Sequence, residues 1–393
     1  MKKKVLFIIN LPPPVYGANV VGQYIKQSSL VNETFYADYI NLTTEKELNN
    51  TGKFRVNKIA IFIKLYTRVF YHLIRRRYNL CYISINAKGS GFYKDFIIVV
   101  LLKLFRCRIV YHYHNKGIAT VQHIWWLNKM YRFQFKNSKV ILLSSRLYDD
   151  IKKYVLKENV FICANGIPEI QGINLVEINK KRNAKAIPEL LYLSNMMKEK
   201  GVFVLLEACK ILKARKINFR MNFVGGWVDI TEGEFNDFVI KNDLGNLIAY
   251  HGRQYGEAKA KYFETADIFI FPTFYSNETF ALVNLEAMQY ELPVITTCEG
   301  GIPDVVSNNI NGYLVEKKNP IALADKILYL IEHPETREKM GAAGRDRYEQ
   351  MFNLKRFENN FVNILENLIT SKYNNEGNKK QLKNVHSTLD RVL

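Results

Sequence analysis

The sequence predicts an α/β protein made of two Rossmann-like domains, whose parallel sheets face each other across a cleft. The chain has 393 residues, 48% of them hydrophobic, which suits two or three domains with sizeable cores. Short apolar segments alternate with helical ones along the chain, the pattern of parallel sheets covered by helices on both faces. A polar stretch without periodicity, which contains Lys180-Lys181-Arg182, divides the chain near its middle.

Ten apolar segments are expected to form the strands. They span residues 5–10, 80–85, 108–113, 140–144 and 160–163 in the first half and 190–194, 220–224, 247–251, 268–271 and 294–297 in the second. We therefore expect an N-terminal domain over 1–170, a linker over 171–188, a C-terminal domain over 189–370 and a polar tail over 371–393. The last helix is expected to pack back on the first domain. Ligands of such sheets bind beyond the carboxyl ends of the strands.

Composition and spacing exclude several classes of protein. The five cysteines are scattered and odd in number, which excludes a disulfide framework and fits a reducing compartment. No apolar run approaches the roughly 20 residues of a membrane span. The apolar start of the chain is interrupted by Asn10 and stopped by Pro12, so we expect a first strand and not a signal peptide.

Positive charge is concentrated in the first half of the chain. Residues 1–170 hold 27 Lys and Arg against 9 Asp and Glu, a net charge of +18, whereas residues 171–393 carry only +1. The first half is therefore expected to meet an anionic partner: nucleic acid, an anionic membrane surface or a phosphate-bearing substrate.

Two helical segments favour the membrane among these partners. Residues 58–77 combine apolar residues at helical spacing with a basic stripe and a basic end, and residues 93–108 combine an aliphatic run with further cations. Such helices often lie against anionic lipid, although each alone also suits a core helix with a basic solvated face. The candidate membrane-surface residues are Lys64, Arg68, Arg75, Arg76 and Arg77.

The most informative stretch, residues 271–306, contains two glutamates eight positions apart. A helix is expected from residue 278 to about residue 290, and its first free amides would bind an anion, most naturally a diphosphate. Glu278 lies at the helix entrance, and Glu286 lies deeper, where its carboxylate suits the hydroxyls of a ribose. A capping acid and a solvated helix glutamate are the alternative. The candidate amide donors are Phe280, Ala281 and Leu282.

Three further cues come from the ends of other strands. Lys200 lies in a turn between a strand and a helix that begins at Gly201, where it could reach a phosphate or be an ordinary exposed lysine. Gly17 lies just before a helix, where the backbone can approach a phosphate. Strand periodicity places His112 and His114 on one face, and without a nearby cysteine or carboxylate set a metal site is not expected.

The second-half motifs resemble those of the retaining glycosyltransferases of the large family 4, which have the GT-B fold. Glu278 and Glu286 match the E-x7-E element of that family, and Phe280 has its usual place. Thr279 and Ala281 replace both glycines of the same element. The resemblance covers roughly residues 4–370 and is strongest in the second half.

The resemblance extends to the G-R-L-x-x-x-K-G element of the family and implies a role for each candidate. Lys200 matches the lysine of that element, and Asn195 stands where arginine is common. Glu278 would orient the transferred sugar, and His114, with His112 second, would help to position the acceptor. The implied donor-binding residues are Gly17, Asn195, Lys200, Thr279, Phe280, Ala281, Leu282 and Glu286.

The resemblance implies a retaining, metal-independent hexosyltransferase that uses a UDP- or GDP-linked sugar as substrate and needs no cofactor. The prolines and the Val20-Val21-Gly22 segment look like the subgroup that acts in bacterial surface-polysaccharide assembly, of the capsule or O-antigen type. The basic first half suits a polyprenyl-diphosphate-linked saccharide as acceptor. We expect a cytoplasmic enzyme, peripheral on the inner face of the plasma membrane, without a nucleic-acid partner.

Three alternatives remain open at this point. A sugar-nucleotide epimerase of GT-B-like form would need no acceptor. A basic nucleic-acid- or lipid-binding protein with a degenerate site would explain the charge but not the pair of glutamates. An inactive scaffold would fit the replaced glycines and the missing arginine.

Overall fold

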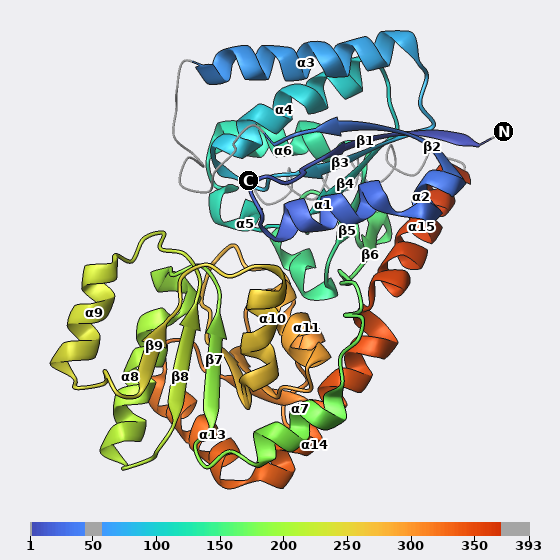
Figure 1. The fold of residues 1–393 in the computed structure, drawn as a ribbon. Helices are drawn as coiled ribbons and strands as arrows, with labels where there is room; N and C mark the ends of the chain where they lie inside the picture. The colour runs from blue at the N-terminus through green and yellow to red at the C-terminus, as the bar shows by residue number, and fades with distance from the viewer. Residues whose placement is uncertain (1, 44–56, 371–393) are drawn as a thin grey trace, which may run out of the picture.

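The computed structural model describes residues 2–43 and 57–370, so the polar tail expected at 371–393 lies outside the described residues. Two six-stranded sheets form the framework, and the strand pairings within the described residues are parallel. Each sheet belongs to its own domain (Figure 1), which confirms the predicted pair of Rossmann-like domains.

The first domain contains the sheet with strand order β2-β1-β3-β4-β5-β6. Its elements are β1 (Lys3–Ile9), α1 (Gly17–Gln27), α2 (Ser29–Thr34), β2 (Phe35–Asn41), α3 (Asn57–Arg75), β3 (Leu80–Ile85), α4 (Gly89–Leu104), β4 (Ile109–Tyr113), α5 (Ile118–Val121), α6 (Trp125–Phe135), β5 (Lys139–Leu142) and β6 (Val160–Ile162). Alternate residues of β1 point to opposite faces of the sheet. Leu6 and Ile8 join the core beneath α3, α4 and α6, and Phe7 joins the core beneath α1.

The second domain contains the sheet with strand order β12-β11-β10-β7-β8-β9. Its elements are α7 (Leu175–Asn183), β7 (Glu189–Leu193), α8 (Val202–Ala214), β8 (Arg220–Val224), α9 (Glu232–Lys241), β9 (Ile248–Tyr250), α10 (Gly256–Thr265), β10 (Ile268–Phe271), α11 (Leu282–Gln289), β11 (Val294–Thr297), α12 (Ile302–Val305), β12 (Gly312–Val315), α13 (Pro320–Glu332) and α14 (Pro334–Arg347).

The final helix, α15 (Leu354–Thr370), returns to the first domain after a π-helical turn over Tyr348–Phe352. Phe361 of α15 is fully buried, and its ring centroid lies 5.2 Å from that of Tyr82 and 6.4 Å from that of Phe7. The side chain of Arg108 donates a hydrogen bond to the carbonyl oxygen of Ile369 (3.1 Å). The last helix therefore covers the face of the first sheet that α1 also covers (Figure 1).

The ten predicted strands are present, with ends that shift by at most two residues. Strands β2 and β12 were not predicted. Strand β2 is an edge strand with a polar, half-exposed sequence that includes Asp38, and β12 is a four-residue strand that follows a loop rich in asparagine. Strand β2 lacks the apolar run by which the other strands were recognised, and β12 offers a run of only three residues after its glycine.

The segment 171–188, predicted as a linker, contains helix α7. Asn174 caps this helix by accepting a hydrogen bond from a first-turn amide (3.1 Å). Arg182 is buried and donates to the carbonyl oxygens of Phe263 (2.7 Å) and Tyr290 (2.8 Å). Because a buried arginine and not an apolar stripe holds α7 to the second domain, its sequence has no helical periodicity.

No helix within the described residues is both long and apolar enough to span a lipid bilayer.

Candidate functional site

The candidate site lies where the carboxyl ends of strands from the two sheets approach each other. His114 follows β4 of the first sheet, and Thr279 follows β10 of the second. The hydroxyl of Thr279 donates a hydrogen bond to the backbone oxygen of His114 (2.9 Å). The two domains therefore touch at the residues that the sequence marked as candidates.

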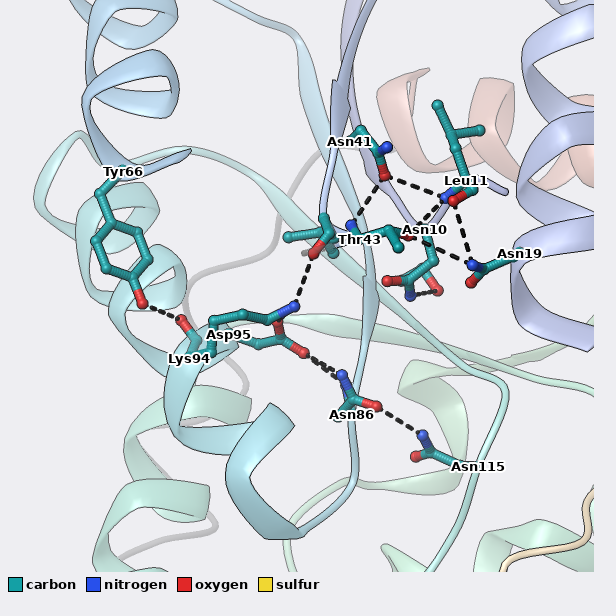
Figure 2. A network of polar contacts seen from close by, with 12 residues as sticks. Asn10, Leu11, Asn19, Asn41, Thr43, Tyr66, Asn86, Lys94, Asp95 and Asn115 are labelled. Atoms are coloured by element: carbon teal, nitrogen blue, oxygen red, sulfur yellow. Dashed lines mark hydrogen bonds and ion pairs between the residues drawn. The ribbon is translucent and has the colours of Figure 1, made fainter. Parts of the chain in front are cut away.

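A network of amide and carboxylate side chains fixes the loops of the first domain (Figure 2). Asp95 is fully buried on α4, and its Oδ2 accepts hydrogen bonds from the backbone and side-chain amides of Asn86 (2.9 and 2.8 Å). Asn115 donates to Asn86 Oδ1 (3.0 Å), and Lys94 donates to the carbonyl oxygen of Leu42 (2.8 Å). The loops after β2, β3 and β4 are thus tied to α4 and to one another.

Helix α11 begins at Leu282, four residues later than predicted, so the helix start expected at residue 278 was wrong. Ala281 precedes the helix in the left-handed conformation, with φ 58° and ψ 77°, and an α-helix cannot continue through that conformation. The first amides of the helix are those of Leu282 and Val283. The amides of Phe280 and Ala281 lie in the loop before it, and their contact with a donor stays a prediction.

Glu278 and Lys200 form an ion pair at the entrance to this loop. Lys200 Nζ lies 2.5 Å from Glu278 Oε2, and both side chains are largely buried. The ammonium group also lies 4.7 Å from the centre of the Tyr275 ring. Helix α8 begins at Val202, one residue after the start predicted at Gly201. The φ of Gly201 is 86°, and a Cβ atom there would lie 2.3 Å from the Pro272 carbonyl oxygen.

Glu286 lies in the middle of α11, close enough to the first domain for its charge to act on Tyr24. Its carboxylate pairs with Lys259 Nζ of α10 (2.6 Å). Burial and, to a smaller extent, the negative charge of Glu286 raise the pKa of Tyr24 on α1 to about 12. Lys259 was not found from the sequence, because α10 is a separate element with no phosphate or sugar motif.

Gly17 also belongs to this junction, as its predicted role requires. It is the first residue of α1, and a Cβ atom placed on it would lie 3.9 Å from Leu282 Cδ1. Asn195 follows β7, and its backbone oxygen accepts a hydrogen bond from the hydroxyl of Tyr192 (3.3 Å). Phe280 is different: its ring is buried and packs edge-on against Phe352, so only its backbone can face a ligand.

His112, within β4, and His114, just after it, lie side by side, which confirms their shared face. Their ring centroids are 4.2 Å apart. His112 is fully buried, and its Nδ1 lies 2.6 Å from the hydroxyl of Tyr82. Burial lowers the pKa of His114 to about 4 and lowers that of His112 as well, so both imidazoles are neutral near pH 7.

A set of ion pairs across the domain boundary was not predicted as functional. Glu299, in the loop after β11, is buried and contacts Lys116 of the first domain and Lys317 of the second (2.5 Å). Burial alone would raise the pKa of Glu299, but the two lysines outweigh it and lower this pKa. Asp304 accepts hydrogen bonds from Ser144 Oγ (2.5 Å) and Arg146 Nε (2.9 Å).

The five candidate membrane-surface residues differ in their surroundings. Lys64 and Arg77 are exposed, Arg68 donates to the Tyr39 carbonyl oxygen (3.5 Å), and Arg75 contacts the hydroxyl of Tyr71. Arg76 instead forms a two-point ion pair with Asp38 (2.8 and 3.0 Å). This pair neutralises the charge of Arg76, and its role as a membrane-facing cation stays a prediction. Over the part of the chain that the structure describes, no cluster of three or more His, Cys, Asp or Glu suited to a metal is present.

A family model matches the second half of the chain. Residues 177–347 match the family model described as "Glycosyl transferases group 1". The capsular polysaccharide biosynthesis glycosyltransferase CapM of Staphylococcus aureus is 30% identical over 161 residues, which are 41% of each chain. The amylovoran biosynthesis glycosyltransferase AmsK of Erwinia amylovora is 27% identical over 68% of this chain and 66% of its own. The matches thus span between about two fifths and two thirds of these two relatives.

Solved structures of similar fold cover nearly the whole chain. Sucrose-phosphate synthase from Thermosynechococcus elongatus superposes with a TM-score of 0.72 at 18% identity, over 95% of this chain and 100% of its own. HepE of Anabaena, in complex with UDP and glucose, superposes with a TM-score of 0.69 at 16% identity, over 93% and 99%. The chain therefore has the GT-B fold and resembles the group 1 glycosyltransferases, including relatives named for bacterial surface-polysaccharide biosynthesis.

Proposed function

We propose that this protein is a glycosyltransferase that moves a hexose from a nucleotide-sugar donor to a saccharide acceptor during surface-polysaccharide synthesis. The observation that carries the proposal is the junction at α11, where Lys200, two carboxylates and the first helix amides lie beside residues that contact the first domain. A cation and free amides suit a diphosphate, and carboxylates suit the hydroxyls of two sugars. Transfer would proceed with retention of configuration and without a metal ion.

Lys200 would have one partner before the donor binds and another partner afterwards. Without a donor its ammonium group is neutralised by Glu278. A diphosphate carries more negative charge than one carboxylate and would draw Lys200 away, which leaves Glu278 free to accept hydrogen bonds from the sugar. As the bond to the sugar breaks, Lys200 and the amides of Leu282 and Val283 would stabilise the charge that develops on the leaving diphosphate.

The remaining groups would position the two sugars. Glu286, held by Lys259, would accept hydrogen bonds from the ribose hydroxyls. His114 is neutral near pH 7, so it can donate or accept a hydrogen bond without placing a positive charge beside the reacting carbon. His114 would orient the attacking hydroxyl of the acceptor. As the oxygen of this hydroxyl bonds to the sugar and the bond between sugar and diphosphate breaks, the hydroxyl proton passes to the diphosphate oxygen.

The donor base is proposed to be uracil or guanine, with support for uracil from the solved neighbours. HepE is described with UDP and with UDP-glucose, and pneumococcal GtfA with UDP and GlcNAc. The acceptor is proposed to be a polyprenyl-diphosphate-linked saccharide, because the first domain carries most of the net positive charge of the chain. The enzyme would then work as a cytoplasmic protein peripheral on the inner face of the plasma membrane.

Thermal unfolding with UDP-, GDP- and ADP-sugars tests the proposal. A donor that binds only the folded protein adds about 2.7 kcal/mol at 100 times its dissociation constant, which raises Tm by a few degrees. We expect the rise to be lost in Glu286→Ala and kept in Glu332→Ala, which removes an exposed carboxylate of α13. In Lys200→Met the rise with UDP should shrink toward that with uridine, because the phosphates lose their contact with Lys200 and keep only the helix amides.

Two results would contradict the proposal. One is a wild-type protein whose Tm no nucleotide sugar changes, and the other is a Glu286→Ala variant with the full rise. Conversion of the donor sugar to its epimer without any acceptor would show an epimerase in place of a transferase.

A further inference from the structure

Large apolar side chains are exposed on α4 and α6, on the side of the first sheet away from α1 and α15 (Figure 1). Trp125 is 64% exposed and Trp126 48%, although tryptophan is usually mostly buried. On α4, three exposed residues follow one another along one stripe at helical spacing. We call this surface the aromatic face, and it consists of Tyr93, Ile97, Leu104, Trp125, Trp126 and Phe133.

Contacts between the helices make the aromatic face continuous. Trp126 Nε1 on α6 donates a hydrogen bond to the hydroxyl of Tyr93 on α4 (3.3 Å). The ring centroids of Phe96 and Phe133 are 5.7 Å apart. At the other edge, the Phe70 ring of α3 lies 5.7 Å from that of Phe105, next to Leu104. The surface thus runs on to exposed residues of α3, namely Ile61, Ile63, Phe70 and Ile74.

Cations surround these side chains, and exposed acids are missing from the three helices. Lys129 Nζ lies 4.7 Å from the Trp125 ring centre, and Lys103 Nζ lies 5.7 Å from that of Phe133. Arg132 is exposed on the same helix as Lys129. The sequences of α3, α4 and α6 contain one carboxylate, Asp95, and its side chain is fully buried and bonded to Asn86.

We propose that the aromatic face docks this protein on an anionic lipid bilayer, with Trp125 and Trp126 inserted at the level of the headgroups. Tryptophan and tyrosine concentrate at membrane–water interfaces, and Lys and Arg near an anionic surface contribute about 1 kcal/mol each. A second copy of the chain would bring like charges together without an acid to pair them. Nucleic acid suits the cations and aromatics but not the aliphatic residues Ile97 and Leu104.

This inference deepens the proposed function, because it names the surface that would hold the enzyme at a lipid-linked acceptor. It also extends the membrane contact that the sequence predicts for the segments 58–77 and 93–108 to the aromatic residues of α6. Trp125 follows Lys116 by nine positions, and Lys116 contacts Glu299 at the domain boundary. A protein docked through Trp125 would therefore hold the acceptor side of the boundary close to the lipid headgroups.

Sedimentation of the full chain with vesicles tests the docking surface. We expect binding to vesicles of phosphatidylglycerol and phosphatidylcholine, weaker binding to phosphatidylcholine alone, and at least a tenfold weaker partition for Trp125→Ser/Trp126→Ser. A matched control, Ile240→Ser/Ile321→Ser, removes two exposed residues of the second domain and should bind as the wild type does. Tryptophan emission should shift to the blue with anionic vesicles, because Trp227, the third tryptophan, is stacked on Tyr250 and already partly buried.

The outcomes separate docking from catalysis. Failure of the wild type to sediment with anionic vesicles, an unchanged emission, or full binding by the tryptophan variant would overturn the docking proposal. Binding to duplex DNA in preference to vesicles would overturn it in favour of a nucleic-acid partner. The rise in Tm with a nucleotide sugar is measured on the same variants, so a protein that docks but binds no donor would contradict only the proposed function.

Discussion

Two residues that depart from the family motif have structural consequences of their own. Thr279, which replaces a glycine, uses its hydroxyl to bond the backbone oxygen of His114 in the other domain. Ala281 replaces the second glycine and has a φ of 58°, a value that glycine adopts without the steric cost that a Cβ atom brings. Thr279 therefore adds a contact between the domains. Ala281 keeps the backbone conformation that a glycine would have, at a cost in conformational energy.

Ala281→Gly is expected to stabilise the protein. The left-handed conformation costs an L-residue roughly 1–2 kcal/mol, and the greater chain entropy of glycine in the unfolded state offsets part of the gain. We expect the free energy of unfolding to rise by about 0.5–1 kcal/mol, measured by urea denaturation. Ala258→Gly, at an exposed helical position of α10, serves as the control and should lower this free energy by a similar amount. A loss of stability in both variants would show that Ala281 is not strained.

Sequence motifs located candidate residues that lie within one strand–loop–helix unit, but not the charged partners that they have in other elements. Glu278, Glu286 and Lys200 were found because each follows a strand end at a recognisable spacing. Lys259 and Glu299 were missed, because their importance lies in ion pairs with residues of other elements. A single sequence does not show which charged residues from distant parts of the chain form ion pairs.

Helices and strands were predictable where an apolar pattern holds them and not where polar contacts do. The ten predicted strands are mostly apolar in sequence, whereas the edge strand β2 and helix α7 depend on polar side chains such as Asp38 and Arg182. The start of α11 was misplaced for a related reason. Its boundary is set by the backbone angle of Ala281, which the surrounding loop imposes and composition does not reveal.

Helix α15 offers the clearest test of how one element joins the two domains. Phe361 is fully buried against Phe7, Tyr82 and His112 of the first domain, although α15 follows the second domain in the chain. Phe361→Ala should lower the free energy of unfolding by about 3–5 kcal/mol, because it opens a cavity beneath the sheet. Asn359→Ala, on the exposed side of the same helix, should change it by less than about 0.5 kcal/mol. Equal effects of the two would mean that α15 does not pack on the first sheet in solution.

At the scale of the whole molecule, ion pairs and hydrogen bonds join the two domains beside the candidate site. Lys116 and Glu299 meet across the boundary, as do Arg146 and Asp304. Interfaces between domains that depend on such polar contacts usually permit relative motion. In the proposed reaction, the donor would enter when these contacts open, and their closure would exclude water from the sugar.

The Lys116–Glu299 contact can be measured with a double-mutant cycle. The double variant Lys116→Met/Glu299→Gln is expected to lose less free energy of unfolding than the two single variants lose in sum. Urea denaturation should give a coupling energy of about 1–3 kcal/mol. The cycle is needed because Glu299→Gln also removes the charge that Lys317 contacts.

Small-angle scattering at pH 7 should show a larger radius of gyration for Lys116→Met than for the wild type, since the lowered pKa of Glu299 keeps its carboxylate charged there. Lys152→Met, which removes an exposed pair within the first domain, should leave the radius unchanged. Additive effects together with an unchanged radius in Lys116→Met would show that this ion pair does not hold the two domains together.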